Sequence, residues 1–304
     1  MPILSFFADG DFDKLPVTAR AVAQADPGST TSGDFALYAL KPCGKEEDFE
    51  ALNWSGNTNG VQGSAHSNSG AFTSGNDQYV TGDLSVTCDG SNISDKDPWN
   101  NEGSNPALSP SSSSVVPDCT GGEAAGEACR QDITPPVPPD YAALYQECDY
   151  SWTSDADPSS DSGVWSAPGG DLFAGVYCST GKLSFSNSGI EIVPTGGREG
   201  ITILADDIVW SGDGSVLTPH LDGILMYANT TEKGKGVDYS ANSGDLEGIL
   251  WSPWEDAKVQ FQGNDNTLTG ALVGYNVDYS GEDNLLIGTF EPQSSGPPTV
   301  ALIE

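Results

Sequence analysis

Basic side chains are scarce in this 304-residue chain, which has 11 Lys and Arg against 44 Asp and Glu and a formal net charge of −33 at pH 7. A protein without a basic surface cannot release counterions from phosphates, so nucleic-acid binding is excluded and attraction to an anionic membrane is unfavourable. The acidic surface instead favours solubility in an exposed, salty or cation-rich setting.

Long apolar segments are also missing, and no stripe of apolar residues at helical spacing is visible. The opening "MPILSFFADGDFDKL" has too short an apolar run for a spanning helix and lacks the basic front and small-residue cleavage site of a signal peptide. We therefore expect little helix, and membrane attachment only through an anchor that is absent from this chain.

Histidine is limited to His66 and His220, and no C-x-x-C pair occurs. Zinc sites with Cys/His spacing and a Ser/His/Asp triad are therefore not expected. The even number of cysteines indicates disulfides formed outside the cytoplasm. Fifteen connectivities are possible, and proximity in the sequence favours Cys119 with Cys129. The six disulfide candidates are Cys43, Cys88, Cys119, Cys129, Cys148 and Cys178.

A repeated pattern takes the place of these missing features. In "VQFQGNDNTLTG", residues 259–270, apolar residues stand four and two positions before Gly263, Asn stands one and three positions after it, and Leu and Gly follow at five and seven. Alternating apolar residues predict a short strand, and the Gly-Asn/Asp step predicts a tight corner. The same frame, in places weakened, recurs around the corner glycines Gly56, Gly75, Gly212, Gly263 and Gly281.

Neighbouring copies lie 18 or 19 residues apart, which suits one coil of a parallel β-solenoid and is too short for a propeller blade. We therefore predict an all-β, right-handed parallel β-solenoid with one Pro/Ser-rich insertion and at most a short helix, for which "DYAALYQEC" with Asp140 as N-cap is the candidate. The predicted segments are an extended lead-in at 1–34, first rungs at 35–96, a cysteine-bearing insertion at 97–165, the main solenoid at 166–290 and a tail strand at 291–304.

Four aromatic residues, which we call the aromatic column, stand at the alternate strand positions that we expect to point inward, as the aliphatic residues of the repeat do. Aromatic rings can stack on sugars, but periodic rings on the inner face of a solenoid usually form its core, and we predict a core role. The column consists of Trp54, Trp210, Phe261 and Tyr279.

The acidic residues offer weak chemical candidates. Asp206 and Asp207 are adjacent on a predicted strand and point to opposite faces, so they cannot serve one catalytic site, and we predict no enzymatic activity. Two acidic loops have spacings that calcium ligands can use, but neither completes an EF-hand, and solvated loops are the favoured interpretation. No cofactor is expected, and calcium is the only possible one. These calcium candidates are Asp9, Asp11, Asp13, Asp155, Asp157 and Asp161.

Most of the chain, from about residue 35 to 290, resembles the β-solenoid ectodomain of bacterial TadE/TadG-like Tad/Flp pilus-assembly proteins. The most specific segments are "YCSTG" at 177–181 and "GILWSP" at 248–253, which a GN-rich rung follows. The resemblance implies a bacterial cell-surface or appendage context more than a reaction.

We therefore expect a non-enzymatic structural or interaction protein of an extracellular pilus-like appendage or cell surface. Its partners would be itself, as a homopolymer joined through the apolar termini "MPILSFF" and "TVALIE", or other envelope proteins. The alternative is a surface protein that binds or cleaves carbohydrate, for which Trp99 and Trp254 are the exposed aromatic candidates.

Overall fold

The computed structural model describes residues 35–43, 51–88, 99–102, 118, 128–131, 133, 136–160, 163–167 and 169–289. All of them belong to the second of two compact units, Ser32–Glu304. The predicted lead-in 1–34 and tail strand 291–304 lie outside the described residues, as do the calcium candidates Asp9, Asp11, Asp13 and Asp161.

The protein is all-β, and its sheets are built from parallel strands. The described part of the chain has one short helical segment, α1 (Tyr141–Leu144), which continues into the 3-10 turn η5 (Tyr145–Glu147). The predicted N-cap is present: the Oδ1 of Asp140 accepts the backbone N–H of Ala142 at 3.0 Å.

The larger sheet has 14 strands. Ten of them follow one another in the order β10 (Tyr150–Trp152), β12 (Gly175–Ser179), β15 (Ile201–Ala205), β18 (Ile224–Ala228), β20 (Asp245–Ser252), β22 (Thr267–Gly274), β1 (Phe35–Ala39), β4 (Ser64–Ser67), β7 (Leu84–Val86) and β9 (Ala128–Arg130). β20 and β22 also extend into a lateral row with β17 (Val216–Leu217), β24 (Leu285–Gly288), β3 (Gly60–Gln62) and β6 (Tyr79–Val80).

The second sheet has eight strands, and a two-stranded sheet lies apart from both. The eight strands run in the order β13 (Lys182–Phe185), β16 (Asp207–Trp210), β19 (Gly236–Tyr239), β21 (Lys258–Phe261), β23 (Asn276–Tyr279), β2 (Leu52–Trp54), β5 (Ala71–Ser74) and β8 (Trp99–Glu102). The small sheet pairs β11 (Leu172–Phe173) with β14 (Ile192–Val193).

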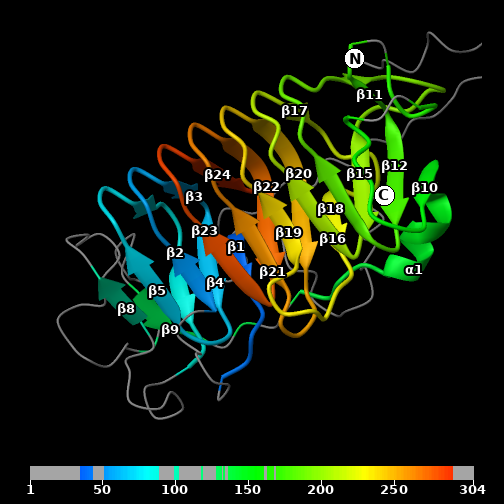
Figure 1. Ribbon diagram of the computed structural model, residues 1–304. Helices are drawn as coiled ribbons and strands as arrows, with labels where there is room; N and C mark the ends of the chain where they lie inside the picture. The colour runs from blue at the N-terminus through cyan, green and yellow to red at the C-terminus, as the bar shows by residue number, and fades with distance from the viewer. Residues whose placement is uncertain are drawn as a thin grey trace, which may run out of the picture. The chain divides into compact units, whose positions relative to one another are not determined.

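The spatial order of the strands differs from their order in the chain. The last long strand, β22, pairs in parallel with the first, β1, with Leu272 opposite Leu37, and β23 pairs with β2 in the same way. The chain therefore forms a first block at 35–130 and a second block at 150–288, and the end of the second block stacks on the beginning of the first. Figure 1 shows this junction, where the orange β22 and the blue β1 lie side by side.

The corner glycines explain how the repeat closes its turns. Gly281 has φ +112°, and a Cβ there would press against the carbonyl oxygen of Gly263 in the neighbouring turn. The residue two positions after each such glycine has a left-handed backbone, as in Asp265 and Asp283, which Asp tolerates better than most residues do. Each corner therefore needs glycine at its first position and a small polar residue two positions later.

The aromatic column lies inside, against the inner face of the eight-stranded sheet. All four predicted members have 0% exposure. Phe185 precedes Trp210 with ring centroids 4.7 Å apart, and Tyr279 contacts Trp54 at 5.6 Å across the junction of the two blocks. Such ring pairs add roughly 0.5–1.5 kcal/mol each beyond the area they bury.

The outer face of the larger sheet is apolar, and part of the predicted insertion covers it. We call this covering segment the strap and define it as Gln131, Ile133 and 136–148. The Tyr38 hydroxyl donates to the Ile133 carbonyl at 3.2 Å. The rings of Tyr227 and Tyr141, the latter in the strap, pack edge to face with 5.1 Å between their centroids. Beneath the strap and along its flanks lies a second hydrophobic cluster that includes Phe35, Tyr38, Leu204, Tyr227, Trp251 and Val273.

The segment predicted as an insertion, 97–165, also contributes strands. β8 and β9 continue the first block, and β10 begins the second. β10 lies at the edge of its sheet, where Tyr150 and Trp152 are half-buried and Ser151 is exposed.

Candidate functional site

A surface pocket of about 320 Å³ opens between the strap and the corners that follow three strands of the larger sheet. This is at the lower end of the range of small-molecule sites, which is roughly 300–1,000 Å³. Its lining residues are Tyr141, Ala142, Tyr145, Ser179, Thr180, Asp206 and Asn229.

The wall on the strap side is fixed by several contacts. Leu144 between the two tyrosines is buried in the second hydrophobic cluster, and a disulfide joins Cys148 at the end of the helical turn to Cys178 of β12, with 5.9 Å between the Cα atoms. Tyr141 and Tyr145 stand four residues apart, so a helical turn brings them to the same side, and their ring centroids are 5.7 Å apart.

The opposite wall is a row of corner residues. Because Cys178 pairs with Leu204 and Leu204 pairs with Tyr227, the residues two positions later, Thr180, Asp206 and Asn229, occupy equivalent places in successive turns. Strand spacing of about 4.8 Å sets the distance between neighbours in this row. The sheet register therefore places a hydroxyl, a carboxylate and an amide side by side.

The next turn extends the row with Trp254. Its indole Nε1 donates to the Oδ1 of Asn229 at 2.7 Å, and the side chain is 40% exposed. Because the indole N–H is engaged, Trp254 offers the carbon atoms of its ring to solvent or a ligand rather than a hydrogen-bond donor.

Asp206 is the ionisable group of the corner row. Partial burial raises the pKa of its carboxyl above the ordinary value, Lys235 lowers it and Glu232 raises it. Lys235 is itself paired with Glu232, with Nζ 2.7 Å from Oε2. The carboxylate of Asp206 also raises the pKa of Tyr145, after burial as the first cause. The pocket thus combines a carboxylate with phenol groups that stay protonated at neutral pH.

Asp207, the other member of the predicted carboxylate pair, is used elsewhere. It lies in β16, and its Oδ1 accepts the backbone N–H of Gly236 at 3.0 Å. Asp206 faces the pocket, so the two carboxylates do not share a site.

The calcium candidates within the described residues are occupied by donors of the chain itself. Asp155 accepts the backbone N–H of Lys182 at 2.8 Å. Asp157 accepts hydrogen bonds from Ser159, Ser160 and Ser186. Burial alone would raise the pKa of Asp157, but these hydrogen bonds outweigh it and lower the pKa. Among the residues that the structure describes, no group of three His, Cys, Asp or Glu is placed to hold a metal.

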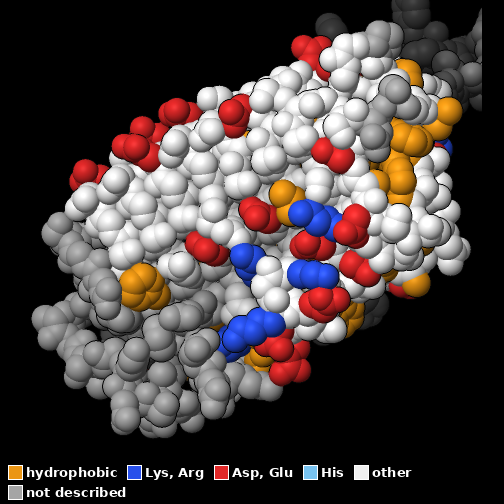
Figure 2. All heavy atoms as spheres, in the orientation of Figure 1, with side chains coloured by type: hydrophobic (Ala, Val, Ile, Leu, Met, Phe, Trp, Pro, Cys, Tyr) orange, Lys and Arg blue, Asp and Glu red, His pale blue; other side chains and the backbone are white. Residues whose placement is uncertain are grey.

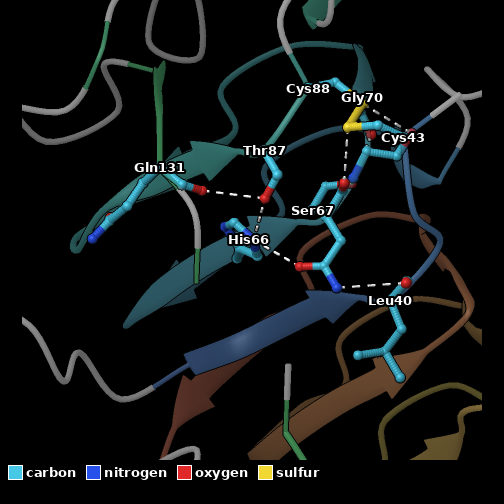
Figure 3. The surroundings of a disulfide bond; sticks show 10 residues. Leu40, Cys43, His66, Ser67, Gly70, Thr87, Cys88 and Gln131 are labelled. Atoms are coloured by element: carbon cyan, nitrogen blue, oxygen red, sulfur yellow. Dashed lines mark hydrogen bonds between the residues drawn. A yellow bond between two sulfur atoms is a disulfide. The ribbon is translucent and has the colours of Figure 1, made fainter. Parts of the chain in front are cut away.

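A second disulfide lies within the first block. Cys43 and Cys88 form a disulfide with 5.6 Å between the Cα atoms (Figure 3). Cys129 is also disulfide-bonded, and Cys119, the partner that proximity in the sequence favours, lies outside the described residues.

His66 is buried near the Cys43–Cys88 disulfide, with 0% exposure. Its Nδ1 is 2.7 Å from the Ser85 hydroxyl and its Nε2 is 3.0 Å from the Asn68 Oδ1. The hydroxyl of Thr87, the residue after β7, lies 3.3 Å from the same Nε2 (Figure 3). Burial lowers the pKa of His66 to about 4, and the hydrogen bond with Asn68 opposes this shift. This histidine is a neutral core residue at physiological pH.

The exposed corners form an acidic row. Asp265, Asp283 and Asp77 project at the left-handed position of the corners after β21, β23 and β5, and Thr58 stands at the equivalent corner after β2. Figure 2 shows acidic side chains spaced along the row of corner loops. Directly inside this row lies a ladder of buried amides, Asn266, Asn284, Asn59 and Gln78, which donate to corner carbonyls of their own and neighbouring turns.

The sequence pattern identified the corner residues, and it missed the pocket. Tyr141 and Tyr145 belong to the predicted short helix, and their spacing of four residues was the available signal. Asn229 follows a strand in a turn that matches the repeat poorly, so only the sheet register reveals it.

No helix within the described ranges has the length and apolar character needed to cross a membrane. Comparisons with known protein families, with curated proteins and with solved structures find no match for this chain. The resemblance to TadE/TadG-like ectodomains therefore stays a prediction.

Proposed function

We propose that the chain is a right-handed parallel β-solenoid that acts as a non-enzymatic structural or interaction protein on the cell surface or in a pilus-like appendage. Support for the solenoid comes from the parallel, in-register pairing of equivalent strands in successive turns, as in the eight residue pairs between β20 and β22. The right hand follows from the strong preference of parallel crossovers for that hand.

The observation that carries a structural role is the continuity of the stack. Ten strands pair in one order through the larger sheet, and the amide ladder continues across the junction between the blocks. Sliding one turn over another would break many hydrogen bonds at once, so such a stack resists shear along its length.

Two features favour a location outside the cytoplasm. Disulfides persist in oxidising compartments, and the described chain has Cys43–Cys88 and Cys148–Cys178. The net charge of −33 favours solubility on an exposed surface. A bacterial appendage context rests on the resemblance to TadE/TadG-like proteins.

Self-assembly through the apolar termini is part of the proposal. Residues 1–7 or 299–304 of one chain would add a strand to an open sheet edge of a second copy, and β10 and β9 are the two ends of the ten-strand order.

Negative-stain electron microscopy of the purified, non-reduced protein, with and without calcium, tests this function. We expect uniform filaments that are lost when residues 1–7 or 299–304 are deleted. Dispersed particles under all conditions, or filaments of normal stability in both deletion variants, would contradict assembly through the termini.

Carbohydrate binding is the second candidate, and the exposed ring of Trp254 beside a pocket favours it. A glycan array tests it with the variants Trp254→Ala and Trp99→Ala. Because the two carboxylates Asp206 and Asp207 are directed to different partners, cleavage of the carbohydrate is not part of the proposal.

A further inference from the structure

The pocket between the strap and the corner row contains chemistry that the structural role does not use. Most residues around it serve packing or backbone hydrogen bonds, whereas the Asp206 carboxylate and the Tyr145 ring border open space. From this arrangement we infer that the pocket bounded by Tyr141, Tyr145, Asp206 and Asn229 binds a neutral sugar. The inference rests on the carbohydrate-binding candidate above and assigns it a site.

Aromatic rings supply the first part of the recognition. Tyr141 and Tyr145 lie on one wall and Trp254 extends the opposite one. The C–H faces of a pyranose ring are apolar, and they pack well on aromatic rings whose polar ends remain hydrated. Tyr141 is held against Tyr227 and the helical turn is tied by a disulfide, so the wall is formed before a ligand arrives.

Donors and acceptors supply the second part. Asp206 offers acceptors only, while Asn229 has its Oδ1 engaged by Trp254 and offers its amide N–H groups. The two occupy neighbouring turns, about 4.8 Å apart by strand spacing. Sugar hydroxyls both donate and accept, so one ring can satisfy a carboxylate and an amide together.

Charge argues against the other ligand classes. An anionic ligand would meet the Asp206 carboxylate and the field of a protein with net charge −33. A simple cation would be attracted by Asp206, but it would make no use of the amide donors of Asn229, and the positive charge of Lys235 already acts on the Asp206 carboxylate and lowers its pKa. A neutral ligand with hydroxyl groups fits all of these side chains.

The test is an array of neutral, acidic and amino glycans, followed by calorimetric titration of the best neutral glycan into the full chain. Three variants are compared: Tyr145→Ala, Asp206→Ala and, as a matched control, Tyr79→Ala, an exposed tyrosine on β6. We expect at least a tenfold loss of affinity for both pocket variants and less than a twofold change for the control. Thermal unfolding checks that all three remain folded.

Tetramethylammonium chloride serves as a cation probe in competition with the glycan. Displacement of the glycan by this cation at equal concentration, or a preference for amino glycans over neutral ones, would overturn the neutral-sugar assignment. Glycan binding that survives both pocket substitutions but is lost in Trp99→Ala would overturn the site and leave the carbohydrate function standing. Absence of binding to any glycan would overturn both.

Discussion

The backbone N–H of Asn284 donates to the side-chain Oδ1 of Asn59 at 3.0 Å, although the two residues are 225 positions apart in the chain. This hydrogen bond joins the last turn of the second block to the first turn of the first block. It continues a ladder in which Asn266 bonds Asn284 in the same way. Both blocks thus share one row of buried amides.

Replacing Asn284 with Ala should destabilise the protein strongly. Its side chain accepts the N–H of Asn266 and donates to the carbonyls of Gly263 and Ser280. Each buried group left without a partner costs about 1–3 kcal/mol, so we expect a loss of at least about 3 kcal/mol in the free energy of unfolding, measured by urea denaturation. The control Asn264→Ala changes an exposed corner residue outside the ladder and should cost less than about 0.5 kcal/mol. Equal effects of the two substitutions would contradict the role of the ladder.

Glycine 281 should tolerate no side chain. In Gly281→Ala the new Cβ meets the carbonyl oxygen of Gly263 and the backbone keeps an unfavourable φ of +112°, so we expect a loss of more than about 4 kcal/mol or failure to fold. Gly234→Ala is the control, because its φ is +81° but nothing lies within 4 Å of the added carbon. That variant should lose about 1–2 kcal/mol. Both variants are measured by circular dichroism and thermal unfolding. The loss in Gly234→Ala gives the cost of backbone strain alone, and the additional loss in Gly281→Ala gives the cost of the steric clash.

The disulfide at the end of the strap should stabilise the fold and limit access to the pocket wall. Cys148 and Cys178 close a loop of 30 residues, for which the loss of chain entropy in the unfolded state predicts about 3–4 kcal/mol. The double variant Cys148→Ser/Cys178→Ser should unfold at lower denaturant concentration and be cut by protease near 136–148 in its folded state. A cleavage rate unchanged from the native protein would show that packing alone holds the strap.

Stability should fall between pH 6.5 and pH 4 because of His66. The folded-state pKa of about 4 lies below the ordinary value of 6.5, so the unfolded state takes up the proton first as the pH falls. The stability due to neutral His66 is complete above about pH 6.5 and is lost as the pH falls to about 4, by roughly 3 kcal/mol. Carboxyl groups titrate in the same range, and the raised pKa of Asp278 acts in the opposite direction.

Comparison with His66→Gln separates the histidine from the carboxyl groups, which are common to both proteins. The difference in unfolding free energy between native protein and variant should shrink by roughly 3 kcal/mol from pH 7 to pH 4. A difference that stays constant with pH would mean that His66 is not held neutral in the fold.

The local repeat could be predicted from sequence because each corner depends on its own residues. Gly263, Asn266 and Leu268 specify a turn, a buried amide and an inward side chain without reference to the rest of the chain. Because each repeat has the same local pattern, the pattern does not show which strands pair. Nothing in the sequence of β22 indicates that its partner is β1. The cysteines and the length of the insertion indicated that it packs on the flank of the sheets, but the residues it covers could not be predicted, because Tyr38 and Tyr227 occupy alternate positions that would face solvent.

The candidate site was harder to predict for a related reason. Asp206 and Asn229 meet only through the register of β15 and β18, and Tyr145 meets them only through the path of the strap. A short tyrosine-containing helix was foreseeable, whereas the surface against which it lies was not.

The junction between β22 and β1 has a consequence for the time at which the protein can complete its fold. Synthesis from the N-terminus releases Phe35–Ala39 early, and Thr267–Gly274 follows more than 200 residues later. Until then one edge of the first block has no strand to pair with, and such an edge can recruit other chains. Because this closing contact is so distant in sequence, folding should be slow. A cell that makes this protein must therefore protect a half-built sheet throughout most of its synthesis.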